Sequence, residues 1–165
     1  RKAATKGLLG IWTQHLTGVV ISVCEVKGWR AVGRGHLAAV LPIVKQEYRA
    51  LDVMAFPQAG AGLAPPVAVF ELENSQRYEY ISYALWKVSL VQCRLKGIFC
   101  YRHDTEEIGA LLKTLGEQVL SGMTISGEES TLVVVGTRSR AEDFPDGFFK
   151  PYWWDEQVEQ FRLLY

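Results

Sequence analysis

Residues 48–87 read YRALDVMAFPQAGAGLAPPVAVFELENSQRYEYISYALWK, and this stretch decides how the rest of the chain is interpreted. The alternating pattern of residues 45–56 predicts a strand, and the apolar residues 67–73 predict a second strand. The glycines and prolines of residues 57–66 predict a loop between them. We therefore expect the two strands to pair antiparallel.

Three acids of the two predicted strands are candidates for a site. Asp52 lies on the first strand, and Glu71 and Glu73 lie on the second. Because side chains two residues apart point to the same face of a strand, we expect Glu71 and Glu73 to lie side by side. Two carboxylates on an otherwise apolar strand are costly to desolvate and repel each other, and a divalent cation compensates both costs. Oxygen-only ligation by carboxylates suits Mg²⁺ or Mn²⁺.

The flanking segments predict alternating helices and strands. Apolar residues recur at steps of three and four over residues 2–27, which predicts a helix for the first half. The β-branched run 19–21 leaves the second half open between helix and strand. The glycines of residues 28–35 predict a loop. Downstream we expect a helix from its cap at Ser75 to about Gln92, followed by a strand over 95–101. A second helix is expected from a capping-box-like start at 104–107 through Val119. A strand over 131–136 and a helical end from Asp155 to about Leu164 complete the chain.

This order of elements predicts an α/β fold, a mixed sheet flanked by helices. At 165 residues the chain has the size of one domain. We expect a core over about 5–138 and an aromatic-rich C-terminal extension over 141–165. Because the sequence begins without a methionine or signal-peptide pattern, we expect a fragment of a longer chain. No apolar run is long enough to span a bilayer, so we expect a cytoplasmic or nucleoid-associated protein without membrane partners.

Charge and cysteine content narrow the function classes. Residues 1–50 carry eight lysines and arginines against two acids, a net +6, and residues 51–165 carry ten against sixteen, a net −6. A basic segment is compatible with phosphate contacts, or with simple attraction to the acidic remainder. The three cysteines have no metal-ligand spacing, so we expect free thiols in a reducing compartment rather than disulfides or a zinc site.

The sequence resembles the PD-(D/E)XK nuclease superfamily in the order helix, acid-bearing strand, Glu-x-acid strand, helix, strand, helix, strand. The resemblance covers roughly residues 5–138 and rests on order and spacing. It implies a restriction-endonuclease-like mixed sheet. It also implies that Asp52 is the first-strand metal ligand, that Glu71 is the second-strand ligand, and that the backbone carbonyl of Leu72 completes the ligand set.

The chain departs from the family pattern at one position. Glu73 stands where the family usually has its catalytic lysine, and some members place Glu or Gln there or supply the cation from the following helix. Lys87 is the lysine of the predicted helix after the second strand, so it is the relocated candidate. Many members also carry an acid on the first helix, and Glu25 is the sole acid before residue 47. The resemblance thus adds Glu25 as a candidate metal ligand.

The function implied is Mg²⁺-dependent hydrolysis of phosphodiester bonds, in which the ion activates an attacking water and a lysine or second acid orients it. DNA is the expected substrate, with RNA as the alternative, within a larger defence, repair or mobile-element protein that supplies other domains or subunits. Four arginines are candidate phosphate contacts: Arg30, Arg34, Arg77 and Arg94. The competing hypothesis is an inactive nuclease-like interaction module, motivated by the missing strand lysine and the neutral net charge.

Overall fold

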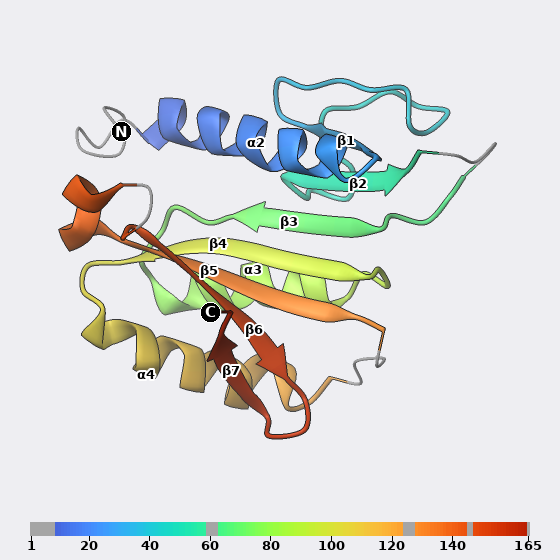
Figure 1. Ribbon diagram of the computed structural model, residues 1–165. Coiled ribbons are helices and arrows are strands. Elements are labelled where there is room, and N and C mark those ends of the chain that lie inside the picture. Colours follow the sequence, from blue (N-terminus) through green and yellow to red (C-terminus); the bar gives the residue numbers. More distant parts are fainter. Residues whose placement is uncertain (1–8, 59–62, 124–127, 145–146, 165) are drawn as a thin grey trace.

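A computed structural model describes residues 9–58, 63–123, 128–144 and 147–164, which form one mixed sheet with helices on both faces (Figure 1). Among these residues there are seven strands, three α-helices, one π-helical segment and one 3₁₀ segment. In chain order they are α2 (Leu9–Val26), β1 (Trp29–Gly33), β2 (Val53–Pro57), β3 (Ala68–Leu72), α3 (Tyr78–Ser89), β4 (Leu95–Arg102), α4 (Glu106–Leu115), η1 (Gly116–Leu120), β5 (Ser130–Thr137), η2 (Arg138–Asp143), β6 (Phe149–Asp155) and β7 (Gln160–Leu163).

The strands lie in the sheet in the order in which they occur in the chain. β1, β2 and β3 form an antiparallel meander, β3, β4 and β5 run parallel, and β6 and β7 return antiparallel. Parallel neighbours require a crossover, and α3 and α4 supply the two that join β3 to β4 and β4 to β5. The predicted α/β class and the antiparallel pairing of the two acid-bearing strands are confirmed. No helix of the described segments has the length and apolar character needed to cross a membrane.

The two faces of the sheet are covered by different helices. On one face, Leu16 and Val20 of α2 pack with Phe70 of β3. On the other, Val69 of β3 packs with Leu85 of α3, which lies behind the sheet in Figure 1, and with residues of α4. Since side chains alternate along a strand, Glu71 shares the α3 face with Val69. The strand alternation inferred from the sequence therefore directs this acid toward α3.

The N-terminal third differs from the sequence-based prediction in one strand. Residues 28–35, predicted as a loop, contain β1, which pairs with β2 along its whole length. A Cβ at Gly33 would lie 2.7 Å from the backbone oxygen of Asp52, so this glycine permits close packing inside a strand and does not mark a turn. The helix that precedes it is continuous to Val26, which resolves the open question about its second half.

The C-terminal segment forms a hairpin, so the predicted helical end is wrong. β6 pairs with β5, and β7 pairs with β6, which extends the sheet. Trp154 is buried and meets Phe161 across the hairpin with ring centroids 5.1 Å apart. Aromatic residues favour strands when they pack across neighbouring strands, and this contact outweighs the helical pattern.

The helix caps also differ from the prediction. α3 begins after Arg77, whose backbone N–H donates to the Ser75 hydroxyl at 3.1 Å, so Ser75 forms a turn ahead of the helix. Within the described part of the chain no side chain caps α4: Asp104 contacts the ring of His103 at 2.9 Å, and Glu107 accepts weakly from the His103 amide at 3.4 Å. The buried stripe of this helix is as predicted. The three cysteines are free and buried, which agrees with the expected thiols.

Candidate functional site

The β2–β3 hairpin brings Asp52 and Glu71 together. Asp52 immediately precedes β2, and Val53 is opposite Phe70, so the next pair along the hairpin is Asp52 and Glu71. The backbone N–H of Asp52 donates to Glu71 Oε1 at 3.1 Å. In turn, the backbone N–H of Leu72 donates to Asp52 Oδ2 at 2.8 Å. Each carboxylate is thus held by the opposite strand, and antiparallel pairing fixes their juxtaposition.

Lys87 of α3 joins this pair of acids. Its Nζ lies 2.7 Å from Glu71 Oε2 and donates to the backbone carbonyl of Ala50 at 2.7 Å. The side chain of Glu71 is 10% exposed and that of Lys87 is 21% exposed. The lysine therefore closes one side of a largely buried site while part of it remains open to solvent.

The turn that precedes Asp52 has an unusual backbone. Arg49 and Ala50 both have positive φ angles, 56° and 55°, between the bridged residues Tyr48 and Leu51. Residues other than glycine rarely adopt this conformation, and two in succession are costly. This turn places the Ala50 carbonyl against Lys87, so the strained backbone supports the position of the ammonium group.

The electrostatic environment makes Glu71 responsive near neutral pH. Burial raises the pKa of Glu71 to about 7, the hydrogen bond from Lys87 lowers it, and the negative charge of Asp52 raises it. Desolvation outweighs the ammonium group because the carboxylate lies under the hairpin and α3. Near neutral pH, Glu71 therefore changes between its protonated and ionised forms, and a metal cation would compete with the proton for the carboxylate.

The donor set fits a magnesium site made by two carboxylates. Among the described residues, no group of three or more histidine, cysteine, aspartate or glutamate side chains is arranged to hold a metal ion. Mg²⁺ keeps several waters and commonly uses one or two carboxylates, so the adjacent Asp52 and Glu71 suffice in chemistry and number. Leu72 lies beside them because its backbone N–H donates a hydrogen bond to Asp52 Oδ2, and its carbonyl stays a predicted ligand.

The two remaining acids of the predicted site lie elsewhere. Glu73 follows the end of β3, and its Oε1 accepts from the Ser75 backbone N–H at 2.6 Å, which shapes the turn into α3. Glu25 is exposed in the last turn of α2, beside the end of the hairpin where Trp29 pairs with Pro57. Asp52 lies at the other end of that hairpin. Neither acid is therefore brought into the Asp52–Glu71 pair.

The four predicted phosphate-contacting arginines do not form one cluster. Arg30 is half-buried on β1 and donates to the carbonyl of Ala39 at 3.3 Å. Arg34 is exposed in the turn after β1, Arg77 is exposed at the start of α3, and Arg94 is exposed just before β4. Of these, Arg77 shares its helix with Lys87, so it has the clearest structural relation to the site.

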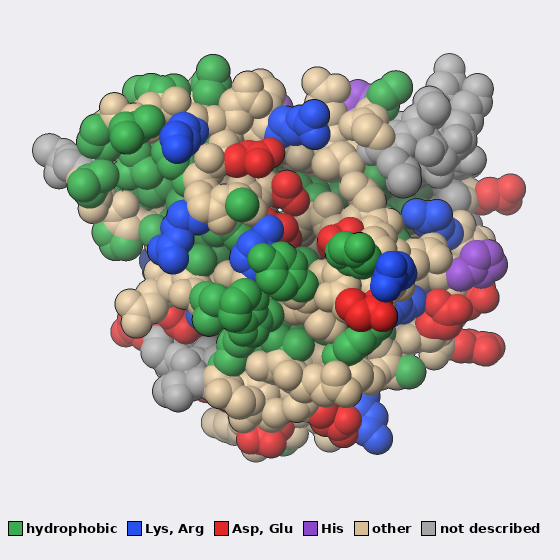
Figure 2. Space-filling view, turned by 180° about the vertical axis from the view of Figure 1, so that it is seen from behind, with side chains coloured by type: hydrophobic (Ala, Val, Ile, Leu, Met, Phe, Trp, Pro, Cys, Tyr) green, Lys and Arg blue, Asp and Glu red, His purple; other side chains and the backbone are tan. Residues whose placement is uncertain are grey.

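A row of exposed aromatic residues on α3 escaped the sequence analysis. Tyr80, Tyr83 and Trp86 are 49%, 58% and 44% exposed. Figure 2 looks onto the face of the molecule behind the view of Figure 1, where hydrophobic side chains gather at the surface with basic side chains beside them. The sequence contains this row as three aromatic residues spaced three apart. They lie outside the apolar positions that predicted the buried face of the helix.

No protein-family model, no curated protein and no solved structure matches this chain. Any function is therefore inferred from the residues of the site.

Proposed function

We propose that this chain is a metal-dependent nuclease domain of the PD-(D/E)XK type that hydrolyses phosphodiester bonds in DNA. One observation supports this above the others: Lys87 Nζ lies 2.7 Å from the carboxylate of Glu71 on β3, and Asp52 lies opposite Glu71 across the hairpin. The helix α3 thereby supplies a cation at a site whose strand carries Glu73 in the family's lysine position. The order of helices and strands also supports the proposal, because α2, β2, β3, α3, β4, α4 and β5 follow the order that the resemblance implies, with β1 inserted after α2 and β6 and β7 added after β5.

Asp52 and Glu71 would hold the divalent cation, Mg²⁺ or Mn²⁺, through their carboxylate oxygens. When bound, such an ion polarises a phosphoryl oxygen and lowers the pKa of a water molecule. The Asp52 carboxylate is oriented by the Leu72 amide, which limits its rotation. Both metal-binding acids are therefore positioned by backbone groups of a rigid hairpin, as precise ligation requires.

Lys87 provides the positive charge of the site. Its ammonium has three donors, and Glu71 and the Ala50 carbonyl take two of them. The remaining donor and the partial exposure of the side chain allow it to orient a water molecule or a phosphate oxygen. The bonds to Glu71 and Ala50 fix the direction of the third donor. In this proposal, orienting a water molecule or a phosphate oxygen with that donor is the role that the family's lysine has.

Cleavage of supercoiled plasmid and of single-stranded DNA, with Mg²⁺ or Mn²⁺ and with a chelator, tests the proposal. Asp52→Asn keeps an acceptor for the Leu72 amide but removes the charge, so we expect metal-dependent cleavage to fall about 100-fold or more. Asp104→Asn, an exposed acid paired with His103, serves as the control and retains activity. Cleavage that persists unchanged in Asp52→Asn, or no cleavage by the parent chain with either metal, overturns the proposal.

A nuclease-like module without activity is the second candidate, and one observation favours it. Lys87 already bonds to the β2–β3 hairpin through Glu71 and Ala50, so the three residues hold α3 in place without any metal. In that case neither metal ion promotes cleavage, and Lys87→Met lowers only the free energy of unfolding. The same purified variants distinguish the two candidates.

A further inference from the structure

The outer face of α3 carries an exposed aromatic row, defined as Tyr80, Tyr83 and Trp86. Side chains three residues apart are neighbours on a helix surface, so the three rings form a row that runs obliquely across the exposed face of α3. The buried residues Ile81 and Leu85 face the sheet. The three aromatic side chains stay about half exposed and lie next to one another, and contiguous exposed apolar patches mark interaction sites.

The geometry of the rings suits stacking. The rings of Tyr83 and Trp86 lie with centroids 5.8 Å apart and an interplanar angle of 26°, so they form an offset stack. Two adjacent, nearly parallel rings offer an extended apolar surface on which flat ligands rest. Nucleobases are flat, and base–aromatic stacking does not require a particular base.

Positive charge accompanies the first and the middle ring of the row. The guanidinium of Arg77 lies 5.2 Å from the centre of the Tyr80 ring, and Lys87 Nζ lies 5.8 Å from the centre of the Tyr83 ring. Glu79, the single acid in the sequence of α3, lies 3.5 Å from Arg77, and both side chains are exposed, so solvent screens this pair. Cations interleaved with aromatic rings match a polymer of bases joined by phosphates, because the rings take the bases and the cations take the phosphates. An apolar protein partner uses no such alternation.

The row is continuous with the candidate active site. Lys87 contacts the ring of Tyr83 on one side and the carboxylate of Glu71 on the other. The exposed Arg49 adds a further cation next to Ala50, whose carbonyl binds Lys87. A single nucleic-acid strand whose bases stack on the row therefore passes beside the Asp52–Glu71 pair.

We propose that the aromatic row binds the unpaired bases of single-stranded DNA, which makes single-stranded or locally unpaired DNA the substrate class of this site. The choice of DNA rests on the nuclease function proposed above. In a duplex the faces of the bases are covered by their neighbours, so the row has nothing to stack on. The row thus selects the unpaired strand and sets it beside Glu71.

Binding without cleavage tests this assignment. The fluorescence anisotropy of a short labelled single strand, and of the same sequence as a duplex, is measured in chelator, so that the metal-dependent reaction is absent. We expect Trp86→Ala and Tyr83→Ala each to weaken single-strand binding by about 5-fold to 150-fold, with duplex binding changed by less than about twofold. Tyr83→Phe keeps the ring and is expected to bind like the parent.

The controls separate stacking from loss of fold. Trp153 is 38% exposed, and it points to the opposite face of the sheet because its neighbour Trp154 is buried on the α3 and α4 side. Trp153→Ala is expected to leave binding unchanged. Thermal unfolding followed by circular dichroism checks that each variant is folded before its affinity is compared.

Four results overturn the assignment. The first is single-strand binding by Trp86→Ala and Tyr83→Ala equal to that of the parent, and the second is an equal loss in Trp153→Ala. The third is RNA of the same sequence bound more than about tenfold tighter than DNA. The fourth is a parent chain that self-associates through the row, seen as a dimer by light scattering that Trp86→Ala abolishes without affecting DNA binding. Asp52→Asn is expected to bind single strands normally, so a failed cleavage assay and a failed stacking assay are distinguishable.

Discussion

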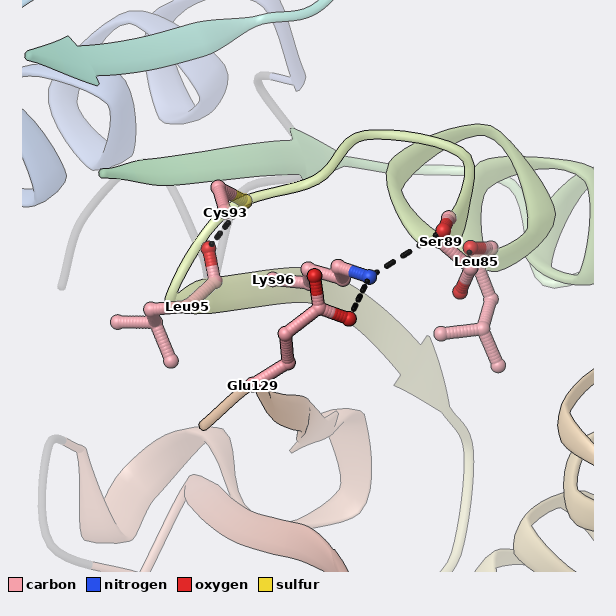
Figure 3. Close-up of polar contacts among 6 residues, drawn as sticks. All are labelled: Leu85, Ser89, Cys93, Leu95, Lys96 and Glu129. Carbon is pink, nitrogen blue, oxygen red and sulfur yellow. Dashed lines mark hydrogen bonds and ion pairs between the residues drawn. The ribbon is translucent and has the colours of Figure 1, made fainter. Parts of the chain in front are cut away.

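Two lysine–glutamate pairs contact the last turn of α3, and they differ in a way that separates a structural clamp from a candidate active site. Lys87 lies 2.7 Å from Glu71, and Lys96 lies 2.8 Å from Glu129. Figure 3 shows the second pair, in which the Lys96 ammonium also reaches the backbone carbonyl of Ser89 at 3.3 Å. Each lysine therefore satisfies one carboxylate and one backbone carbonyl.

The surroundings of the two pairs are unlike. Lys96 is 4% exposed and Glu129 is 13% exposed, and the pair ties the end of α3 to the segment before β5. Lys87 is more exposed, and its partner Glu71 has a second carboxylate, Asp52, directly across the hairpin. The ion pair is thus common to both places. A neighbouring acid and an open side are what mark the Lys87 pair as a site.

The largest stability effect is expected when the enclosed pair is broken. Lys96→Met leaves the Glu129 carboxylate buried without its cation, which costs about 3–5 kcal/mol of the free energy of unfolding. Lys87→Met is expected to cost about 1 kcal/mol, because Glu71 takes up a proton near neutral pH and becomes uncharged. Urea unfolding of both variants measures the difference. Equal losses in the two variants contradict the contrast drawn between the pairs.

The next effect concerns the pH dependence of stability. The pKa of Glu71 rises from 4.5 to about 7 on folding, so the folded state binds this proton more tightly than the unfolded state. This contribution is fully present below pH 4.5 and is lost as pH rises through about 7. Relative to Glu71→Gln, which does not titrate, the parent is expected to lose about 3 kcal/mol over this range. A flat difference in urea unfolding free energy across the range contradicts the assigned environment of Glu71.

The smallest effect is expected at Glu73. Its carboxylate accepts from the Ser75 amide, and glutamine at that position keeps an acceptor, so Glu73→Gln is expected to change the cleavage rate by less than about threefold. Cleavage kinetics on the single-stranded substrate measure this ratio. A loss as large as that of Asp52→Asn would return Glu73 to the reacting groups and remove the distinction between the two glutamates of this segment.

The sequence alone predicted the parts of the site that depend on local patterns. Alternation along residues 67–73 placed Glu71 on the same face as Val69, and the Gly/Pro loop predicted an antiparallel hairpin, whose register in the structure sets Asp52 opposite Glu71. The bonds of Lys87 to Glu71 and Ala50 depend on how α3 packs against the hairpin and on two positive φ angles, and no local pattern encodes these. Tertiary contacts likewise decided β1, where the glycines predicted a loop, and the C-terminal hairpin, where residues 155–164 were predicted to be helical.

The most direct test of the central claim compares two helix lysines in the same cleavage assay. Lys87→Met removes the ammonium beside Glu71, and Lys113→Met removes an exposed lysine of α4 that lies 3.9 Å from Glu117. With Mg²⁺ and single-stranded DNA, we expect the rate to fall about 100-fold in Lys87→Met, as when a group that stabilises transition-state charge is removed. Lys113→Met is expected to cleave like the parent. A folded Lys87→Met that cleaves at the parent rate would contradict the assignment of this lysine to the active site.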